Sequence, residues 1–287
     1  MDGERREPDA RSLTQAPLPR VGGSWLCGGM DAATSADGTL IAYEQRGEGP
    51  TVVIVNGALS LGADAGAIAD ALVDAGFRAV IWDRRARGDS GDKRGSTPED
   101  EAADLAAVID AVGGDTIVLG HSSGAVLALF AASLGVPIRA LFLSEPPLRF
   151  GIDEPASDLA DRLQRLVDEG NGEDAVATFQ SEGVGLPQEM VDAGRESGQL
   201  ATLAPLGQST VYDVLLTRQV SVPTPEMRAV TQPVTVLRGE QTFPVIITGS
   251  DQLAEAIAQA ELVVVPESVM HRPDPVATAR VVRERTS

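Results

Sequence analysis

Cysteine and histidine are scarce in this chain of 287 residues. Cys27 stands alone, so the chain can form no internal disulfide and no metal site built from several cysteines. The histidines are His121 and His271, and no His/Cys cluster has metal-ligand spacing. A phosphate-binding P-loop and a dinucleotide fingerprint are also missing from the sequence. We therefore expect neither a metal nor a cofactor.

Basic residues are few compared with acidic ones. The chain has 23 Lys+Arg against 42 Asp+Glu, which gives a formal net charge of -19, and Lys93 is its single lysine. An acidic chain is repelled by phosphate backbones and by anionic lipid headgroups, so we expect no nucleic acid and no membrane as partners. No apolar run approaches the length that crosses a bilayer. A small-molecule substrate is the expected partner, and the oligomeric state is left open.

The first residues lack the apolar core of a secretory signal. Residues 1–20 are polar and contain proline, and Trp25 is the first residue able to pack. We expect residues 1–30 to form a disordered extension and the protein to be cytoplasmic. The remaining length suits one large α/β domain with a small insertion.

Short apolar segments alternate with segments of helical spacing along most of the chain. Strands are expected at residues 51–55, 78–82, 116–119, 138–143, 234–237 and 262–265, and helices around 68–75, 97–112, 125–134, 253–260 and from about 275. An Asp37-Gly38 pair predicts a hairpin in front of them. The alternation predicts an α/β fold, in which a mostly parallel, doubly wound sheet is covered by helices on both faces.

The alternation breaks after Pro147. Residues 150–229 show helical patches and no convincing strand, so we predict a helical cap inserted into the sheet domain. The predicted organisation is therefore a first core part at residues 31–149, the cap at 150–229, and a second core part at 230–287.

The pentapeptide Gly120-His121-Ser122-Ser123-Gly124 fits the pattern G-x-S-x-G. It directly follows a β-branched strand and directly precedes an apolar helix, which is the setting that a nucleophile elbow requires. Glycines leave room for a tight turn with a strained backbone. Such a turn lifts a serine hydroxyl clear of the sheet and directs a helix N-terminus at a developing oxyanion. The pattern predicts Ser122 as a nucleophile.

Four stretches resemble the serine α/β-hydrolase family, and more narrowly its small esterase-type members of high-GC bacteria. They are VIVNGALS at 53–60, WDRRARGDSG at 82–91, GHSSG at 120–124 and SEPP at 144–147. The likeness covers roughly Thr39 to the C-terminus and is faint over residues 150–229. It implies the α/β-hydrolase fold and an acyl-enzyme formed on a serine.

A serine hydroxyl needs a general base within hydrogen-bond reach. His121 lies inside the elbow, where its side chain cannot reach round to the hydroxyl of its neighbour. That leaves His271, which follows the strand at 262–265 in the loop where this family places its histidine. We predict His271 as the general base.

The third member of the triad should be a carboxylate that orients the imidazole. The family's usual position corresponds here to Thr242, which cannot serve, and Glu240 lies close by but offset. Some members of the fold carry their acid at the end of the strand that here covers 138–143, and Glu145 stands there. We favour Glu145 and keep Glu240 as the less favoured alternative.

The resemblance also implies an oxyanion hole of two backbone N–H groups. One belongs to the residue after the nucleophile, Ser123, and the other to the loop after the strand at 51–55, where Ala58 is the candidate. Gly57 lets this loop turn inward, and Asn56 supports it where many relatives have histidine.

The run from Asp83 to Lys93 mixes arginines with acids. We interpret it as a structural turn in which Asp83, Asp89 and Asp92 neutralise the arginines, rather than as an anion site. The expected activity is hydrolysis of a small or medium ester, thioester or lactone. A lyase or cyclase of the same fold and a ligand-binding relative are the alternatives.

Overall fold

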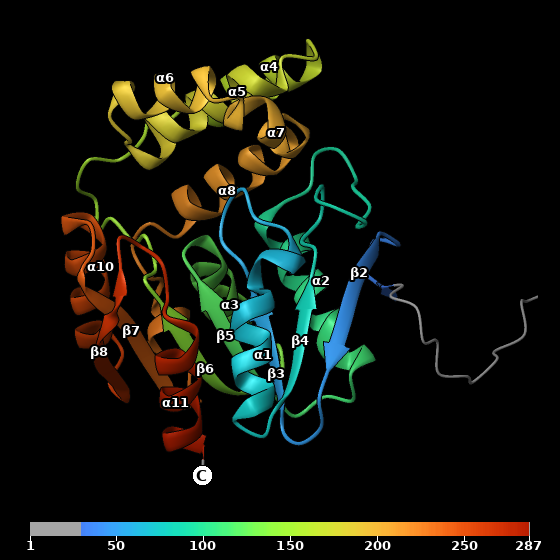
Figure 1. The fold of residues 1–287 in the computed structure, drawn as a ribbon, viewed down its shortest axis with the longest axis vertical. Helices are drawn as coiled ribbons and strands as arrows, with labels where there is room; N and C mark the ends of the chain where they lie inside the picture. Colours follow the sequence, from blue (N-terminus) through green and yellow to red (C-terminus); the bar gives the residue numbers. More distant parts are fainter. Residues whose placement is uncertain (1–29, 287) are drawn as a thin grey trace, which may run out of the picture.

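An eight-stranded sheet forms the centre of the computed structural model, which describes residues 30–286 (Figure 1). The strands are β1 Asp31–Thr34, β2 Leu40–Arg46, β3 Thr51–Val55, β4 Arg78–Trp82, β5 Thr116–His121, β6 Ile138–Ser144, β7 Val234–Gln241 and β8 Ala260–Val269. Their order is β1-β2-β4-β3-β5-β6-β7-β8. The pairs β1–β2 and β2–β4 are antiparallel, and all other neighbours are parallel. The predicted, mostly parallel sheet and its leading hairpin are confirmed, whereas the predicted extension at 1–30 lies outside the described residues except for Met30.

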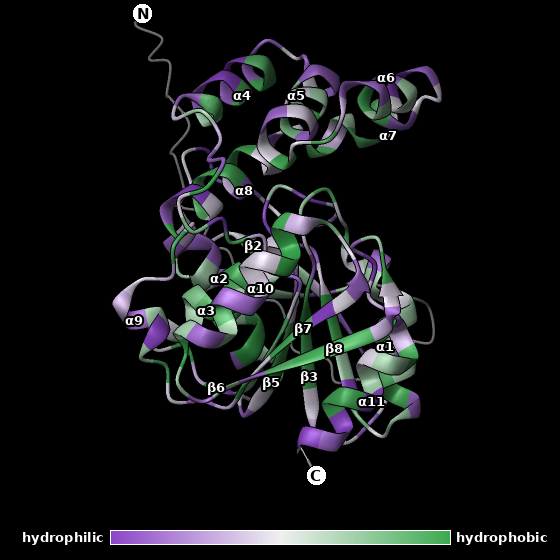
Figure 2. Ribbon diagram, turned by 90° about the vertical axis from the view of Figure 1, so that its left-hand side faces the viewer, coloured by the Kyte–Doolittle hydropathy of each residue, from purple (hydrophilic) through white to green (hydrophobic). Residues whose placement is uncertain are grey.

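Helices cover both faces of this sheet, as the alternation predicted (Figure 2). Helices α1 Gly66–Asp74 and α11 Pro275–Thr286 pack on one face, and a short 3₁₀ helix, η1 Gly62–Ala65, precedes α1. Helices α2 Pro98–Ala111, α3 Ser123–Ser133 and α10 Pro244–Ala256 pack on the other. Among residues 30–286, no helix combines the length and the apolar character that a membrane span needs.

The central strands are buried on both faces. Every residue of β3 is buried, and successive side chains alternate between the two cores: Val53 and Val55 join one, and Val52 and Ile54 join the other. This two-residue period and the β-branched composition are typical of parallel strands between helical layers. Packing on both faces therefore holds the carboxyl ends of these strands in place, and the loops that follow them start from fixed positions.

Helix α3 is apolar on all sides, and its residues from Ser123 to Ala132 are all buried. A helix of this kind belongs inside a core. The turn between β5 and α3 is consequently held by packing at both ends.

Residues 150–229 contain helices and turns but no strand. The elements are α4 Leu159–Asp168, α5 Gly172–Thr178, the π-helical η2 Phe179–Val184, α6 Gln188–Glu196, α7 Gln199–Leu203, η3 Ala204–Leu206, α8 Gly207–Gln219 and α9 Pro225–Arg228. Helices α4 to α8 form a separate layer beyond one end of the sheet (Figure 1). This layer has small apolar cores of its own, one centred on Leu159, Leu163 and Phe179.

One predicted helix is clearly misplaced. The helix expected near 253–260 lies earlier, because α10 begins at Pro244 and ends at Ala256, and β8 already starts at Ala260. Proline fits the first helical turn, where its missing N–H is not needed. Ile257 ends the helix because its backbone is extended, with φ -108° and ψ 113°.

Candidate active site

The turn that carries Ser122 connects β5 to α3 with a strained backbone. Ser122 has φ 54° and ψ -127°, a positive-φ conformation that non-glycine residues rarely adopt. A Cβ atom added at Gly120 would lie 2.5 Å from Ala125 Cα, and one added at Gly124 would lie 2.1 Å from Val55 O. Gly120 and Gly124 must therefore be glycine, because a side chain at either position would collide with the backbone.

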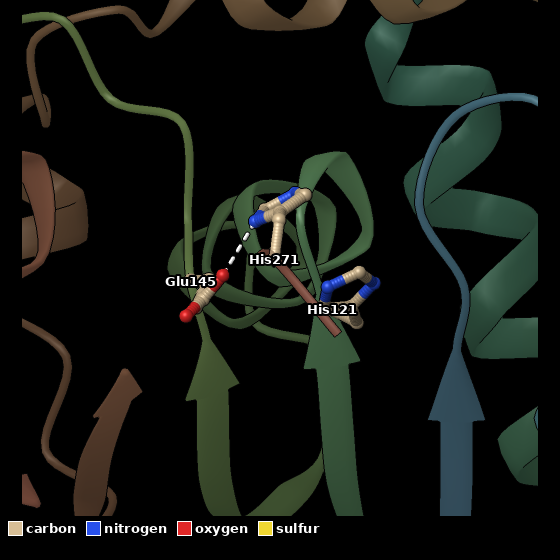
Figure 3. A group of neighbouring side chains, drawn as sticks. All are labelled: His121, Glu145 and His271. Atoms are coloured by element: carbon tan, nitrogen blue, oxygen red, sulfur yellow. Dashed lines mark hydrogen bonds and ion pairs between the residues drawn. The ribbon is translucent and has the colours of Figure 1, made fainter. Parts of the chain in front are cut away.

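His271 and Glu145 face each other across a short contact (Figure 3). His271 lies beyond the end of β8, and its Nδ1 atom is 2.6 Å from Glu145 Oε2. Glu145 follows β6 directly and is 1% exposed. Glu240 is exposed on β7. Of the two carboxylates considered from the sequence, the structure brings Glu145 to the imidazole.

Hydrogen bonds hold Glu145 as a carboxylate. Its Oε1 accepts the Gly239 N–H at 2.8 Å, and its Oε2 accepts the Thr242 hydroxyl at 3.1 Å. Burial opposes the charge, but the bonds from His271, Gly239 and Thr242 outweigh it and hold the pKa of Glu145 below its ordinary value. Thr242, at the position where the family has its acid, thus supports the acid that Glu145 supplies.

A backbone hydrogen bond holds Ser122 next to the residue that precedes Glu145. Its backbone N–H donates to Ser144 O at 2.9 Å, and His121 and Ser144 are register partners on β5 and β6. Ser122 and Glu145 therefore follow directly from two adjacent strand ends. Within residues 30–286 no hydrogen bond joins the Ser122 hydroxyl to His271. Catalytic hydrogen bonds in free enzymes are often long and tighten when substrate binds.

His121 packs against His271, which the sequence reasoning missed. The two ring centroids are 4.7 Å apart, and the planes are tilted by 40°. Burial, with a smaller contribution from His271, lowers the pKa of His121 to about 3, against weaker opposing effects of Glu145 and the His271 backbone. His121 is therefore a neutral imidazole at neutral pH. Together with Glu145 and His271 it also forms a group of possible metal ligands, whose donor atoms lie within 4.8 Å of one another.

The loop after β3 lies against the serine turn. A Cβ atom added at Gly57 would be 2.8 Å from Ser122 Cβ and 3.4 Å from Ser122 Oγ. Asn56 Nδ2 donates to Leu61 O at 2.5 Å and so closes the loop, as expected of a supporting residue. The loop backbone at Gly57 therefore lies close to the Ser122 side chain.

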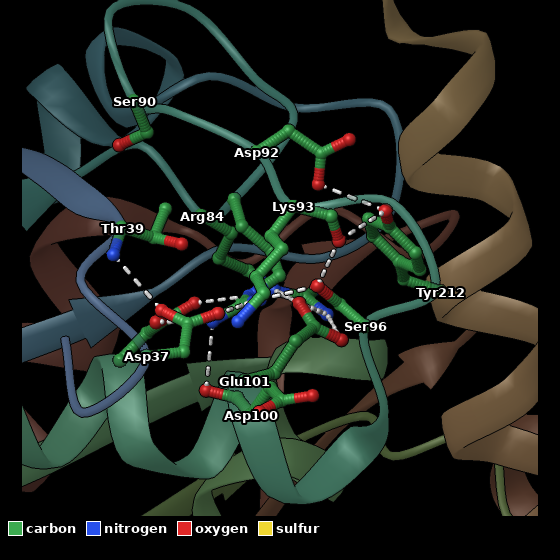
Figure 4. A network of polar contacts seen from close by, with 12 residues as sticks. Asp37, Thr39, Arg84, Ser90, Asp92, Lys93, Ser96, Asp100, Glu101 and Tyr212 are labelled. Carbon is green, nitrogen blue, oxygen red and sulfur yellow. Dashed lines mark hydrogen bonds and ion pairs between the residues drawn. The ribbon is translucent and has the colours of Figure 1, made fainter.

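The arginines of the 83–93 run are paired, but with other partners than predicted. Arg84 binds Glu101 of α2 at 2.7 Å and Asp213 of α8 at 3.0 Å. The predicted neutralisation by Asp83, Asp89 and Asp92 is wrong, because the arginines extend instead to buried carboxylates of α2 and α8. Asp83 instead accepts the Gly62 N–H, and Asp92 accepts the hydroxyl of Tyr212 of α8 at 2.8 Å (Figure 4).

Comparison with known proteins identifies the family and the fold. The family model described as "Alpha/beta hydrolase family" matches residues 22–281. Among curated proteins no match was found.

Many solved structures share the fold. An alpha/beta hydrolase from Sphaerobacter thermophilus is 37% identical, with a TM-score of 0.82 over 90% of this chain and 100% of that one. A thermophilic esterase from Thermogutta terrifontis is 23% identical, with a TM-score of 0.66 over 90% of this chain and 96% of that one. The enol-lactonase from Burkholderia xenovorans is 18% identical, with a TM-score of 0.62 over 89% and 97% of the two chains.

Proposed function

Because the chain belongs to the alpha/beta hydrolase family, a hydrolase fold whose members include esterases, we propose that it is a serine hydrolase of small or medium carboxylic esters, thioesters or lactones. One observation carries the proposal. Ser122 stands on a strained turn with φ 54°, next to a buried Glu145 that is 2.6 Å from His271. A nucleophile, a base and an orienting acid are the components that acyl transfer requires.

In the proposed reaction, His271 takes the proton of the Ser122 hydroxyl while Ser122 Oγ attacks the carbonyl carbon. Glu145 fixes the imidazole through Nδ1 and stabilises the imidazolium that forms. The backbone N–H groups of Ala58 and Ser123 bind the oxyanion of the tetrahedral intermediate. His271 then returns its proton to the leaving oxygen or sulfur, and an acyl-enzyme remains.

Water completes the cycle. His271 now deprotonates a water molecule, which attacks the acyl carbonyl, and collapse of the second intermediate releases the acid and restores the Ser122 hydroxyl. Throughout, His121 is neutral beside the imidazolium, so it adds no like charge to it. We assign the α4–α8 layer the role of a cap over the substrate. We also propose a cytoplasmic location, on the basis of the sequence.

The substrate class is argued from the fold and from its relatives. The similar structures include an esterase and an enol-lactonase, which supports an ester or a lactone as the substrate class. Among the described residues, the nearby guanidinium groups of Arg84 and Arg87 are paired with buried carboxylates, so their charges are neutralised and do not favour an anionic substrate. A neutral ester is therefore the best-fitting substrate.

A fluorophosphonate probe tests the nucleophile directly. We expect the probe to label the protein and short p-nitrophenyl esters to be hydrolysed, and Ser122→Ala to abolish labelling and lower kcat by about 1000-fold or more. Glu145→Gln should lower kcat by about 100-fold or more, whereas the exposed Glu240→Gln serves as its control and should change kcat less than about twofold.

Two outcomes would contradict the proposal. Labelling that persists in Ser122→Ala would show that another residue is the nucleophile. Labelling of Ser122 without turnover of any ester, thioester or lactone would favour a lyase or cyclase, an alternative suggested by Asn56 at a position where many relatives have histidine.

A further inference from the structure

Four buried charges lie beneath the proposed oxyanion hole. Arg84, Arg87, Glu101 and Asp213 have side chains that are at most 2% exposed. Two positive and two negative charges balance each other there. Burying a charge lowers the stability of the fold unless the charge is paired and hydrogen-bonded. Each contact in this group therefore helps to hold the four side chains in place.

Arg87 spans the distance between the loop after β3 and helix α8. Its Nη1 donates to Gly57 O at 2.6 Å, and its Nη2 binds Asp213 Oδ2 at 2.7 Å. A trans peptide is planar, with C=O and N–H on opposite sides. When Arg87 fixes the Gly57 carbonyl, it therefore turns the N–H of Ala58 away from itself and polarises it as a donor.

Asp213 also contacts the residue that carries the second proposed oxyanion donor. The Ser123 hydroxyl donates to Asp213 Oδ1 at 2.7 Å, and Arg84 Nη1 donates to the same hydroxyl at 3.1 Å. Arg84 Nη1 lies 3.3 Å from Asn56 O as well. One carboxylate on α8 thus supports both the Gly57–Ala58 peptide and Ser123.

The supported peptide lies directly beside the nucleophile, given how closely a Cβ atom at Gly57 would approach Ser122. A small rotation of this peptide would move the Ala58 N–H relative to the reacting carbon. Displacements of about 1 Å in such a site can reduce rates by about 100-fold.

We propose that Arg87, held by Asp213 of α8, is a positioning residue that orients the Ala58 N–H for the oxyanion. This inference rests on the proposed function. It couples the α4–α8 layer to the chemical step, because the carboxylate that holds the guanidinium belongs to that layer.

Electrostatics make Arg87 dependent on Asp213. Burial and the nearby Arg84 both lower the pKa of Arg87, and Asp213 is the carboxylate in direct contact that opposes them. Arg87 Nε has no hydrogen-bond partner among the described residues, so Arg87 is held through its two Nη atoms. Without the Asp213 charge, two guanidinium groups would share one buried carboxylate.

Arg87→Lys tests the positioning role, and Arg85→Lys is its matched control. Arg85 is also fully buried and binds Asp104 at 2.6 Å, but it makes no hydrogen bond to residues 56–60. A lysine keeps the charge at either position but cannot bridge two acceptors as a guanidinium does. Both variants should lose thermal stability, so stability alone does not distinguish them.

The expected difference lies in catalysis. With a short p-nitrophenyl ester, Arg87→Lys should lower kcat by about 10- to 100-fold with little change in KM, somewhat less than deletion of an oxyanion donor. Its affinity for a boronic acid, which forms a tetrahedral adduct with the serine, should fall by a similar factor. Arg85→Lys should change both quantities by less than about threefold.

If Arg87→Lys does not fold, Asp213→Asn removes the carboxylate that holds Arg87 with a side chain of equal size. Because Asp213 also binds the Ser123 hydroxyl and Arg84, this variant tests the support of both proposed oxyanion donors together. Equal kcat in the Arg87 and Arg85 variants, or an unchanged boronic acid affinity, would overturn the positioning role and leave the proposed function intact. A wild-type protein that neither hydrolyses esters nor reacts with the fluorophosphonate would overturn both.

Discussion

At the scale of single residues, three residues of the site share an uncommon backbone conformation with positive φ. Ser122, Glu145 and His271 have φ values of 54°, 51° and 61°. Positive φ is costly for such residues and persists where surrounding structure imposes it. All three follow the end of a strand, so the sheet supplies that constraint.

His121 gives a pH dependence that can be measured. Its pKa is about 3 in the folded protein and 6.5 when unperturbed, so between these values the unfolded chain binds a proton that the folded chain does not. The contribution of His121 to stability should therefore fall as pH decreases below about 6.5, with a slope that approaches about 1.4 kcal/mol per pH unit, and should be constant above that pH.

The measurement is urea unfolding of wild type and His121→Gln from about pH 7.5 to about pH 5, where most carboxylates stay ionised. We expect the free energy of unfolding of the wild type to decrease more steeply than that of the variant. His271 is present in both proteins, so the difference reports the loss of His121 together with its effect on the neighbouring His271. Parallel curves would show that His121 is protonated in the folded state.

At the scale of elements, the turn between β5 and α3 packs closely against the end of β3. A Cβ atom added at Gly124 would lie 2.1 Å from Val55 O and 2.6 Å from Asn56 O. The close approach lets α3 start directly beneath Ser122. It also brings the loop after β3 into contact with the serine turn.

Gly124→Ala should therefore destabilise the protein by at least about 1–3 kcal/mol, since the added methyl meets backbone and cannot be relieved by a rotamer change. Gly66→Ala is the matched control, because Gly66 has helical φ and its Cβ would meet only the flexible tip of Arg46 at 3.9 Å. Alanine there should be neutral or stabilising by up to about 1 kcal/mol. Urea unfolding of both variants checks this; equal stabilities would mean that β3 and α3 can move apart.

At the scale of the whole molecule, the net charge of the chain contrasts with the balanced charge of the buried group beneath the site. The chain as a whole carries a net charge of -19, yet the buried group beneath the site is balanced. The protein's long-range field should therefore repel anionic substrates, while the site itself exerts no compensating attraction.

Comparison of two esters tests this field. For a p-nitrophenyl ester with an anionic acyl chain, kcat/KM should rise with ionic strength, because salt screens repulsion over about 10 Å at 0.1 M. For a neutral ester of similar length it should stay nearly constant. A salt response that is the same for both esters would place its cause in the protein's structure rather than in its field.

The sequence by itself determined the features that depend on a few neighbouring residues. The parallel strands, the covering helices and the glycines around Ser122 follow from local periodicity and from steric limits on a tight turn, and the structure agrees with each. The boundary of α10 was misplaced because helix ends depend on caps and packing more than on composition.

Only the tertiary structure decided which distant groups meet. It paired His271 with Glu145 rather than with Glu240, placed the His121 ring against the tilted His271 ring, and joined Arg87 to Asp213 across 126 positions of sequence. A carboxylate in a sequence has no direction, and several acids compete for each arginine. The order of the strands and the docking of α8 select one partner, because those alone fix which side chains come within hydrogen-bond distance.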